Sequence, residues 1–186
     1  MDATDRYVVI TVPGGAVGLV TSSRGLWQVI LLKPETARDA PSMAARMPHA
    51  KLDADLLPGL QRQIRDYFAG KPAQFRVKID LSTASPFHRR VLEACRTVSY
   101  GETVPYGQLA RLAGNPKAAR AVGAAMARNP LPLVIPCHRV IAGDGSLGGF
   151  SAEQGVDLKR KLLAMEASAV TRSVIESKRA SGIRFA

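Results

Sequence analysis

The segment Ile135-Pro136-Cys137-His138-Arg139-Val140 places a thiol beside an imidazole, directly after a proline. Two more prolines, Pro130 and Pro132, stiffen the approach to this segment, and four glycines follow it between positions 143 and 149. A cysteine attacks only as a thiolate. Because the thiol pKa is ordinarily about 8.5, a reactive cysteine needs a base or a positive charge nearby. An isolated Cys-His pair is more often a buried structural cysteine beside a surface histidine, but the surrounding sequence favours the reactive alternative here.

Charge is spread unevenly along the 186 residues, which carry 26 Lys and Arg against 15 Asp and Glu and a net charge of +11. No acidic residue lies between Glu102 and Asp144. The same window contains the basic residues Arg111, Lys117, Arg120, Arg128 and Arg139. A surface charged only for solubility mixes both signs, so this window predicts contact with a polyanion, and nucleic acid is the first candidate.

The two cysteines, Cys95 and Cys137, are far apart and show no Cys-x-x-Cys spacing, so we expect no metal site. Cys95 lies in an amphipathic stretch and is expected to be a small core residue, with a disulfide to Cys137 as the open alternative. No apolar run has the length of a signal-peptide core or of a membrane span. We therefore expect no membrane partner and a location in the cytoplasm, or in the nucleus of a eukaryote.

Residues 1–82 are predicted to form a small antiparallel sheet with one helix. The strands are expected at residues 7–12, 17–21, 26–32 and 75–81. Pro13-Gly14-Gly15 is a turn sequence, and the alternation of strands and turns is typical of a meander. Residues 56–68 repeat apolar side chains at a helical period and are followed by the stop signal Gly70.

Residues 83–169 change character and predict a helical domain built around a helix-turn-helix. Ser85-Pro86 is a typical helix start, because serine caps the first turn and proline fits its first position. The helices are expected at residues 86–98, 106–113, 117–128 and 157–169. Gly114 fits the tight turn before the third helix, and Asn115-Pro116 is predicted to cap that helix. The fold class is thus α+β, and residues 170–186 are interpreted as a basic tail.

The helix expected over residues 117–128 has almost only small side chains. A helix this slim can press its backbone against another surface and suits a narrow groove, although tight packing between helices favours alanine and glycine equally. Lys117 and Arg128 fall on nearly the same side of the helix, and Arg120 lies part of a turn away. This arrangement predicts a cationic edge for phosphates.

Three sequences together resemble one family: the Cys-His segment at residues 136–140, Asn-Pro-Lys-Ala-Ala-Arg-Ala-Val-Gly at residues 115–123, and Gly-Gln-Leu-Ala at residues 107–110. The family is that of the O6-alkylguanine-DNA alkyltransferases, also called methylated-DNA–protein-cysteine methyltransferases. The resemblance covers roughly residues 86–166, while the first half resembles the family only in its general pattern of a sheet domain. It implies a ribonuclease-H-like sheet domain followed by a winged-helix-like domain.

The resemblance implies DNA repair by direct transfer of an alkyl group from O6-alkylguanine in duplex DNA to Cys137, with O4-alkylthymine as a second candidate substrate. A soft thiolate displaces the electrophilic alkyl carbon in one step, so no cofactor is needed. Each molecule acts once, since the thioether product is not hydrolysed. In this scheme His138 relays the thiol proton through a water, Glu166 orients His138, and Asn129 ties the cysteine turn to the helix-turn-helix.

Atom O6 faces the inside of a duplex, so the resemblance also implies that the base leaves the stack, here from the minor-groove side. Tyr106 would help rotate the nucleotide, and Arg120 would fill the gap. The other residues expected against DNA are Lys117, Ala121, Gly123 and Arg128. The residues expected to line the base pocket are Met126, Pro132, Val140, Gly148, Phe150 and Ser151. We expect a monomer that binds duplex DNA containing alkylated guanine, with cooperative binding along DNA as the open alternative.

Three places depart from the pattern of the family. The stretch Ala152-Glu153-Gln154-Gly155 is slightly longer than in some members, which is expected to widen or reshape the pocket. Phe150 stands where many members have tyrosine, so a stacking wall is kept while a hydroxyl is lost. Pro105 precedes Tyr106 where serine is common, which predicts that Thr103 caps the helix instead. All three changes bear on the range of substrates and not on the reaction.

Three other functions compete with alkyl transfer. A protein that senses lesions without repairing them would have lost its cysteine, whereas Cys137 is present. A helix-turn-helix regulator whose cysteine senses alkylation would be expected to carry a second DNA-binding module. A Cys-His hydrolase would take its base from a distant part of the chain and would need no basic helix.

Overall fold

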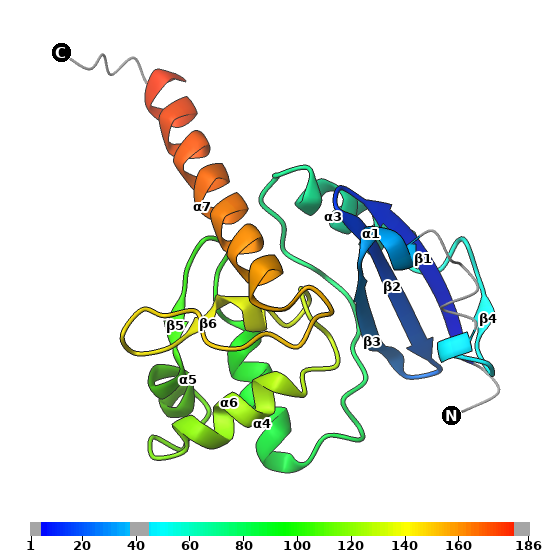
Figure 1. The fold of residues 1–186 in the computed structure, drawn as a ribbon, viewed down its shortest axis with the longest axis horizontal. Helices are drawn as coiled ribbons and strands as arrows, with labels where there is room; N and C mark the ends of the chain where they lie inside the picture. The colour runs from blue at the N-terminus through cyan, green and yellow to red at the C-terminus, as the bar shows by residue number, and fades with distance from the viewer. Residues whose placement is uncertain (1–4, 38–44, 181–186) are drawn as a thin grey trace.

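The computed structural model describes residues 5–37 and 45–180. A sheet with one principal helix forms the first half, and the second half is mainly helical (Figure 1). The last helix, α7 (Gly155–Ala180), starts against the second half, and its C-terminal part projects away from the rest of the molecule (Figure 1). The predicted α+β class is confirmed.

The sheet has the strand order β3-β2-β1-β4. Its strands are β1 (Arg6–Val12), β2 (Gly15–Ser22), β3 (Gly25–Leu32) and β4 (Lys51–Leu52). The first three form the predicted antiparallel meander, and β4 adds in parallel to β1. A Cβ atom on Gly15 would lie 2.2 Å from the carbonyl oxygen of Leu32, so only glycine fits where β2 passes the end of β3.

Alternate residues of each strand point to opposite sides of the sheet, and both sides carry buried residues. One face packs against α3 (Pro58–Phe68), whose Leu60, Ile64 and Tyr67 are buried. The other face carries a small cluster made of Tyr7, Ala16, Val20, Leu32 and Met47. The cluster on the α3 side continues into the helical half, so the two halves share one core.

The strand predicted over residues 75–81 is wrong except at one point. Only Ile79 forms a bridge, to Leu26 of β3, and its neighbours Lys78 and Asp80 provide the hydrogen bonds at 2.9 and 2.8 Å. Further along the same edge, the amide of Val29 donates to the carbonyl of Pro130 at 2.8 Å. The open edge of β3 is thus shared between two segments, and neither forms a full strand.

The second half begins with a capped helix, as predicted. The amide of His88 donates to the Ser85 hydroxyl at 3.3 Å. The elements that follow one another are α4 (Pro86–Arg96), β5 (Val104–Pro105), α5 (Tyr106–Leu112), α6 (Ala119–Ala127), the 3-10 turn η1 (Cys137–Arg139) and β6 (Val140–Ile141). Helices α4, α5 and α6 contact one another, and α5 with α6 forms the predicted helix-turn-helix pair.

The predicted caps of α5 and α6 are wrong. Helix α6 starts after Ala118 with no side-chain cap, because Asn115 is used in the turn, where its backbone bonds to Ala110 and Ala118. Lys117 therefore precedes the helix. Helix α5 starts after Pro105 without a side-chain cap, so Thr103 does not cap it. Pro105 instead ends β5, which pairs in parallel with β6.

Helix α7 is twice as long as the helix predicted over residues 157–169, so residues 170–180 of the predicted tail are helical, and residues 181–186 lie outside the described part. The sequence signal failed there because Val170, Val174 and Ile175 are exposed and show no buried face. Within residues 5–37 and 45–180, no helix combines the length and the apolar character needed to cross a membrane.

Candidate active site

Cys137 opens the η1 turn between the proline-rich approach and β6. Its amide donates to the carbonyl of Ile135 at 2.8 Å, and the amide of Arg139 donates to the carbonyl of Pro136 at 2.9 Å. The pairing of β6 with β5 fixes the other end of the turn. Only 4% of Cys137 is exposed. The thiol is therefore held in a buried, hydrogen-bonded turn.

Asn129 ties the end of α6 to this turn. Its buried side chain donates to the carbonyl of Ile135 at 2.8 Å and accepts from the amide of Leu131 at 3.0 Å. Between them Leu133 has a φ of 71°, which is rare for a residue with a branched side chain. The Asn129 side chain thus joins the two ends of a strained approach to Cys137, while its predicted part in catalysis stays a prediction.

Glu166, on α7, is fully buried and gathers donors from both halves of the chain. Its Oε1 accepts from the Tyr67 hydroxyl at 2.6 Å and from His138 Nε2 at 2.8 Å. Its Oε2 accepts from the amide of Gly101 at 3.0 Å. The Arg139 guanidinium donates to both oxygens, at 3.0 and 3.1 Å. Every lone-pair direction of this carboxylate is therefore in use.

The ion pair of Arg139 with Glu166 fixes the charge of the cluster. Burial alone would raise the pKa of Glu166, but the hydrogen bonds from His138, Arg139 and Tyr67 outweigh it and lower the pKa to about 2. Arg139 is only 6% exposed and also donates to the carbonyl of Val98 at 2.7 Å. The prediction that Arg139 contacts a polyanion is therefore wrong, because its charge is paired with Glu166 inside the protein.

His138 is completely buried, and burial lowers its pKa by disfavouring the cation, although Glu166 opposes this effect. The imidazole is therefore neutral at pH 7. Because Nε2 faces a carboxylate that can only accept, Nε2 carries the proton and Nδ1 carries the lone pair. Among the described residues, Nδ1 has no hydrogen-bond partner. The described structure thus leaves a ring nitrogen with a free lone pair on the residue that follows Cys137 in the sequence.

The pKa of Cys137 is raised, because burial disfavours the thiolate more strongly than Asn129 and Lys159 favour it. Lys159, on α7, is itself buried, and its ammonium donates to the carbonyl of Val140 at 2.6 Å and to that of Leu147. The thiol is therefore neutral at rest, and a base must remove its proton when it reacts.

Two members of this cluster escaped the sequence analysis. Tyr67 showed only the helical period of a core residue, and its contact with Glu166 joins positions 99 residues apart. Lys159 stands in a run of charged residues, Lys159-Arg160-Lys161, which is typical of an exposed helix face. Neither position carries a local signal that could have revealed it.

The residues predicted to meet DNA lie on and before α6. Arg120, Ala121 and Arg128 are exposed on the helix or at its end, and Lys117 is exposed in the turn before it. Val122, Ala125 and Met126 point inward. Tyr106, at the start of α5, is half-buried; a Cβ atom on Gly123 would lie 3.9 Å from its ring. An outward face of small and cationic side chains results.

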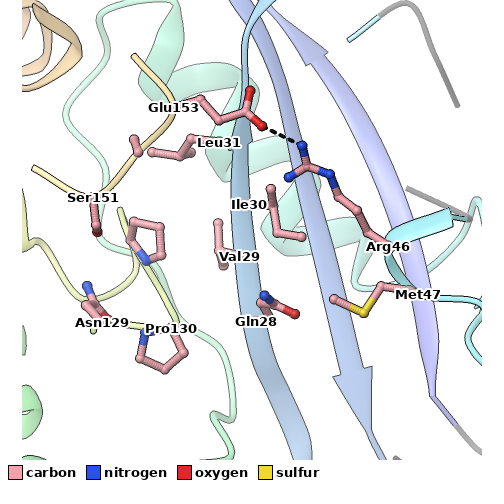
Figure 2. A pocket seen from close by; sticks show the side chains of 12 residues that line it. Gln28, Val29, Ile30, Leu31, Arg46, Met47, Asn129, Pro130, Ser151 and Glu153 are labelled. Atoms are coloured by element: carbon pink, nitrogen blue, oxygen red, sulfur yellow. Dashed lines mark hydrogen bonds and ion pairs between the residues drawn. The ribbon is translucent and has the colours of Figure 1, made fainter. Parts of the chain in front are cut away.

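The predicted pocket residues do not gather in one described cavity. Met126 and Val140 are core residues, and Phe150 packs against the core. A Cβ atom on Gly148 would lie 3.2 Å from the Tyr106 hydroxyl, so these two positions touch. Two further predicted residues, Pro132 and Ser151, line a cavity with a volume of about 450 Å³. The cavity lies between β3 and the segments that contain these two residues (Figure 2). Their role in binding a base stays a prediction.

Comparison with known proteins places this geometry in a family. The family model described as 6-O-methylguanine DNA methyltransferase, DNA binding domain, matches residues 86–168. A methylated-DNA–protein-cysteine methyltransferase of Methanosarcina acetivorans is 35% identical over 87% of this chain and 98% of its own length. The crystal structure of the Mycobacterium tuberculosis O6-methylguanine methyltransferase is 36% identical, with a TM-score of 0.74 over 89% of this chain and 94% of that one. A structure of the protein from that organism in complex with DNA gives the same TM-score and covers 88% and 94%. The chain therefore belongs to the methylated-DNA–protein-cysteine methyltransferases, the 6-O-methylguanine DNA methyltransferase family.

Proposed function

We propose that this protein repairs DNA by moving the alkyl group of O6-alkylguanine in a duplex onto the sulfur of Cys137, once per molecule. The observation that carries the proposal is the buried chain of Glu166 and His138, whose free Nδ1 belongs to the residue next to the cysteine. In the reaction the bond from Sγ to the alkyl carbon forms as the bond from that carbon to O6 breaks. The electron pair stays on O6, and the purine takes up a proton to become guanine.

The order of proton transfer follows from the pKa directions. The raised pKa of Cys137 keeps the thiol protonated in the resting protein, so the nucleophile is produced at the moment of reaction. His138 receives the proton at Nδ1 through one water, and the carboxylate of Glu166 stabilises the imidazolium that results. Glu166 remains ionised throughout, because its pKa is about 2.

Duplex DNA is bound through α6 and the turn before it. Arg120, Arg128 and Lys117 supply charge for phosphates, and the small side chains between them allow the helix to lie close in the minor groove. Tyr106 rotates the damaged nucleotide out of the stack, and Arg120 fills the space left behind. The related Mycobacterium tuberculosis protein in complex with DNA supports this partner. A winged-helix-like second domain and a ribonuclease-H-like first domain are the finer description of the fold that accompanies this proposal.

Intact mass spectrometry tests the transfer directly. The protein is mixed with a duplex that carries a single O6-methylguanine, and the Cys137→Ser variant serves as the control. We expect a gain of one methyl on Cys137 at no more than one per molecule, and no gain in the variant. Binding to the damaged duplex without a gain in mass would overturn the proposal in favour of a lesion sensor. A duplex that carries O4-methylthymine, used in the same assay, tests the second candidate substrate.

A further inference from the structure

The loop between β6 and α7 is held to the rest of the protein from two sides. It spans residues 142–154 and carries Gly148, Phe150 and Ser151, the predicted far wall of the base pocket. Near its middle, the buried ammonium of Lys159 donates to the carbonyl of Leu147. Because Lys159 belongs to the helix that follows the loop, this first anchor lies within the helical half.

The second anchor comes from the N-terminal half. Arg46 Nη2 donates to Glu153 Oε1 at 2.6 Å, an ion pair that Figure 2 shows between two residues that line the cavity. The amide of Lys33, just after β3, lies 3.4 Å from Glu153 Oε2. The side-chain amide of Gln154 approaches the carbonyl of Gly14 at 3.5 Å. The end of the wall is therefore tied to the β-sheet half by polar contacts.

The cavity of about 450 Å³ explains why these contacts matter. Ser151, Ala152 and Glu153 line it on the side of the loop, and β3 lines it on the other side (Figure 2). Protein interiors are close-packed, so a loop backed by packed side chains keeps its position without help. This part of the wall instead borders the cavity, so the loop has space into which it can move.

We infer that Arg46 and Glu153 are positioning residues that set the place of the Phe150-Ser151 wall and thereby the size of alkyl group that the protein accepts. The inference rests on the proposed alkyl transfer. With the ion pair formed, the wall stands close to the base and favours a methyl group. With the pair broken, the wall moves toward the cavity and admits a larger group, such as benzyl, at the expense of alignment for methyl.

Because the ion pair of Arg46 and Glu153 is partly exposed, a role in positioning the wall can be told apart from a role in stabilising the fold. The side chains of Arg46 and Glu153 are 41% and 27% exposed. Ion pairs this accessible contribute at most about 1 kcal/mol to stability. Their loss should therefore alter the kinetics of transfer while the melting temperature changes little.

The experiment compares Arg46→Gln, Glu153→Gln and the charge-swapped pair R46E/E153R with the unmodified protein. Single-turnover transfer is measured on duplexes that carry O6-methylguanine or O6-benzylguanine. We expect methyl transfer to slow by about three- to tenfold in each single variant, since misplacement of a reacting group by a fraction of an ångström costs this much. Benzyl transfer slows less, so the benzyl-to-methyl ratio rises, and the swapped pair restores the ratio to within about twofold.

Arg160→Gln is the matched control. It removes the same charge from an exposed Arg–Asp pair, with Asp157 on α7, that has the same 2.6 Å separation. An unchanged ratio in both single variants, or an equal loss with both substrates, would overturn the inference while leaving the transfer function intact. If the unmodified protein transferred neither group, the proposed function would be the one to fail.

Discussion

Glu166 and Glu153 are both held by an arginine, yet their surroundings are opposite. Glu166 is fully buried, and its two oxygens bond to a tyrosine, a histidine, an amide and the Arg139 guanidinium. Glu153 meets Arg46 at the surface, beside a cavity. In the proposed function, the buried pair holds the group that accepts the thiol proton in one geometry. In the further inference, the exposed pair holds a wall that can move. Under these two proposals, the reaction belongs to the rigid region and the choice of substrate to the adjustable one.

The largest effect is expected from Glu166→Gln, which tests the rigid side of this comparison. The variant leaves the buried charge of Arg139 without its counterion, and breaking a buried pair in this way costs about 3 to 5 kcal/mol of unfolding free energy. Transfer should slow by at least about a hundredfold, because His138 loses the carboxylate that stabilises its cation. Urea denaturation and single-turnover transfer measure the two losses. Glu176→Gln, on the exposed part of α7, is the control, and equal stability of the two variants would contradict the assignment.

Tyr67→Phe tests how far the sheet half supports the same carboxylate. Removal of the 2.6 Å hydrogen bond to Glu166 should lower the unfolding free energy by about 1.5 to 3 kcal/mol, the usual range for a bond to a charged group, and slow methyl transfer about tenfold. Tyr100→Phe is a matched control, since the Tyr100 ring packs 5.9 Å from that of Tyr67 while its hydroxyl has no hydrogen-bond partner among the described residues. Equal effects of the two variants would mean that ring packing, and not the hydroxyl, supports the site.

Acid should weaken the rigid region gradually. The pKa of Glu166 is about 2, below its ordinary 4.5, so its contribution to stability is complete above 4.5 and is lost as the pH falls toward 2. The pKa of His138 is also lowered, so the unfolded chain takes up a proton first below pH 6.5, which again favours unfolding. Urea denaturation at pH 7, 5 and 3 should show a stepwise decrease. The transfer rate should be flat above pH 7 and fall only below 6.5, whereas a rate that kept rising above pH 8 would show that the thiolate must form in advance.

Sequence patterns correctly predicted the elements that depend on neighbouring residues. They failed for features that form where distant segments of the chain come into contact. Alternation and turn residues located β1, β2 and β3, because each strand has its own buried face. The strand at residues 75–81 failed because its bridge from Ile79 to Leu26 is parallel and lies at the start of β3, so the residues before Ile79 run beyond the end of that strand and have no edge to pair with. The resemblance named Cys137, His138 and Glu166, which the structure brings into one region. Tyr67 is recognised only when α3 meets α7, and Lys159 only when α7 meets β6 and the loop that follows it. The pair Arg46–Glu153 joins positions 107 residues apart and has no local signature.

The hydroxyl of Tyr67 has a consequence for how this chain can be divided. All four residues predicted to be catalytic lie in the segment that the family model matches, residues 86–168, which invites the view of a self-contained repair unit with an accessory sheet. The phenol that bonds to Glu166, however, is supplied by α3 in the other half. A fragment trimmed at residue 86 would keep every named catalytic group and still lack a donor at the centre of its charge network. A minimal or fused version of this protein is therefore expected to need α3 as well as the segment that the family model matches, if it is to keep the full set of hydrogen bonds around Glu166.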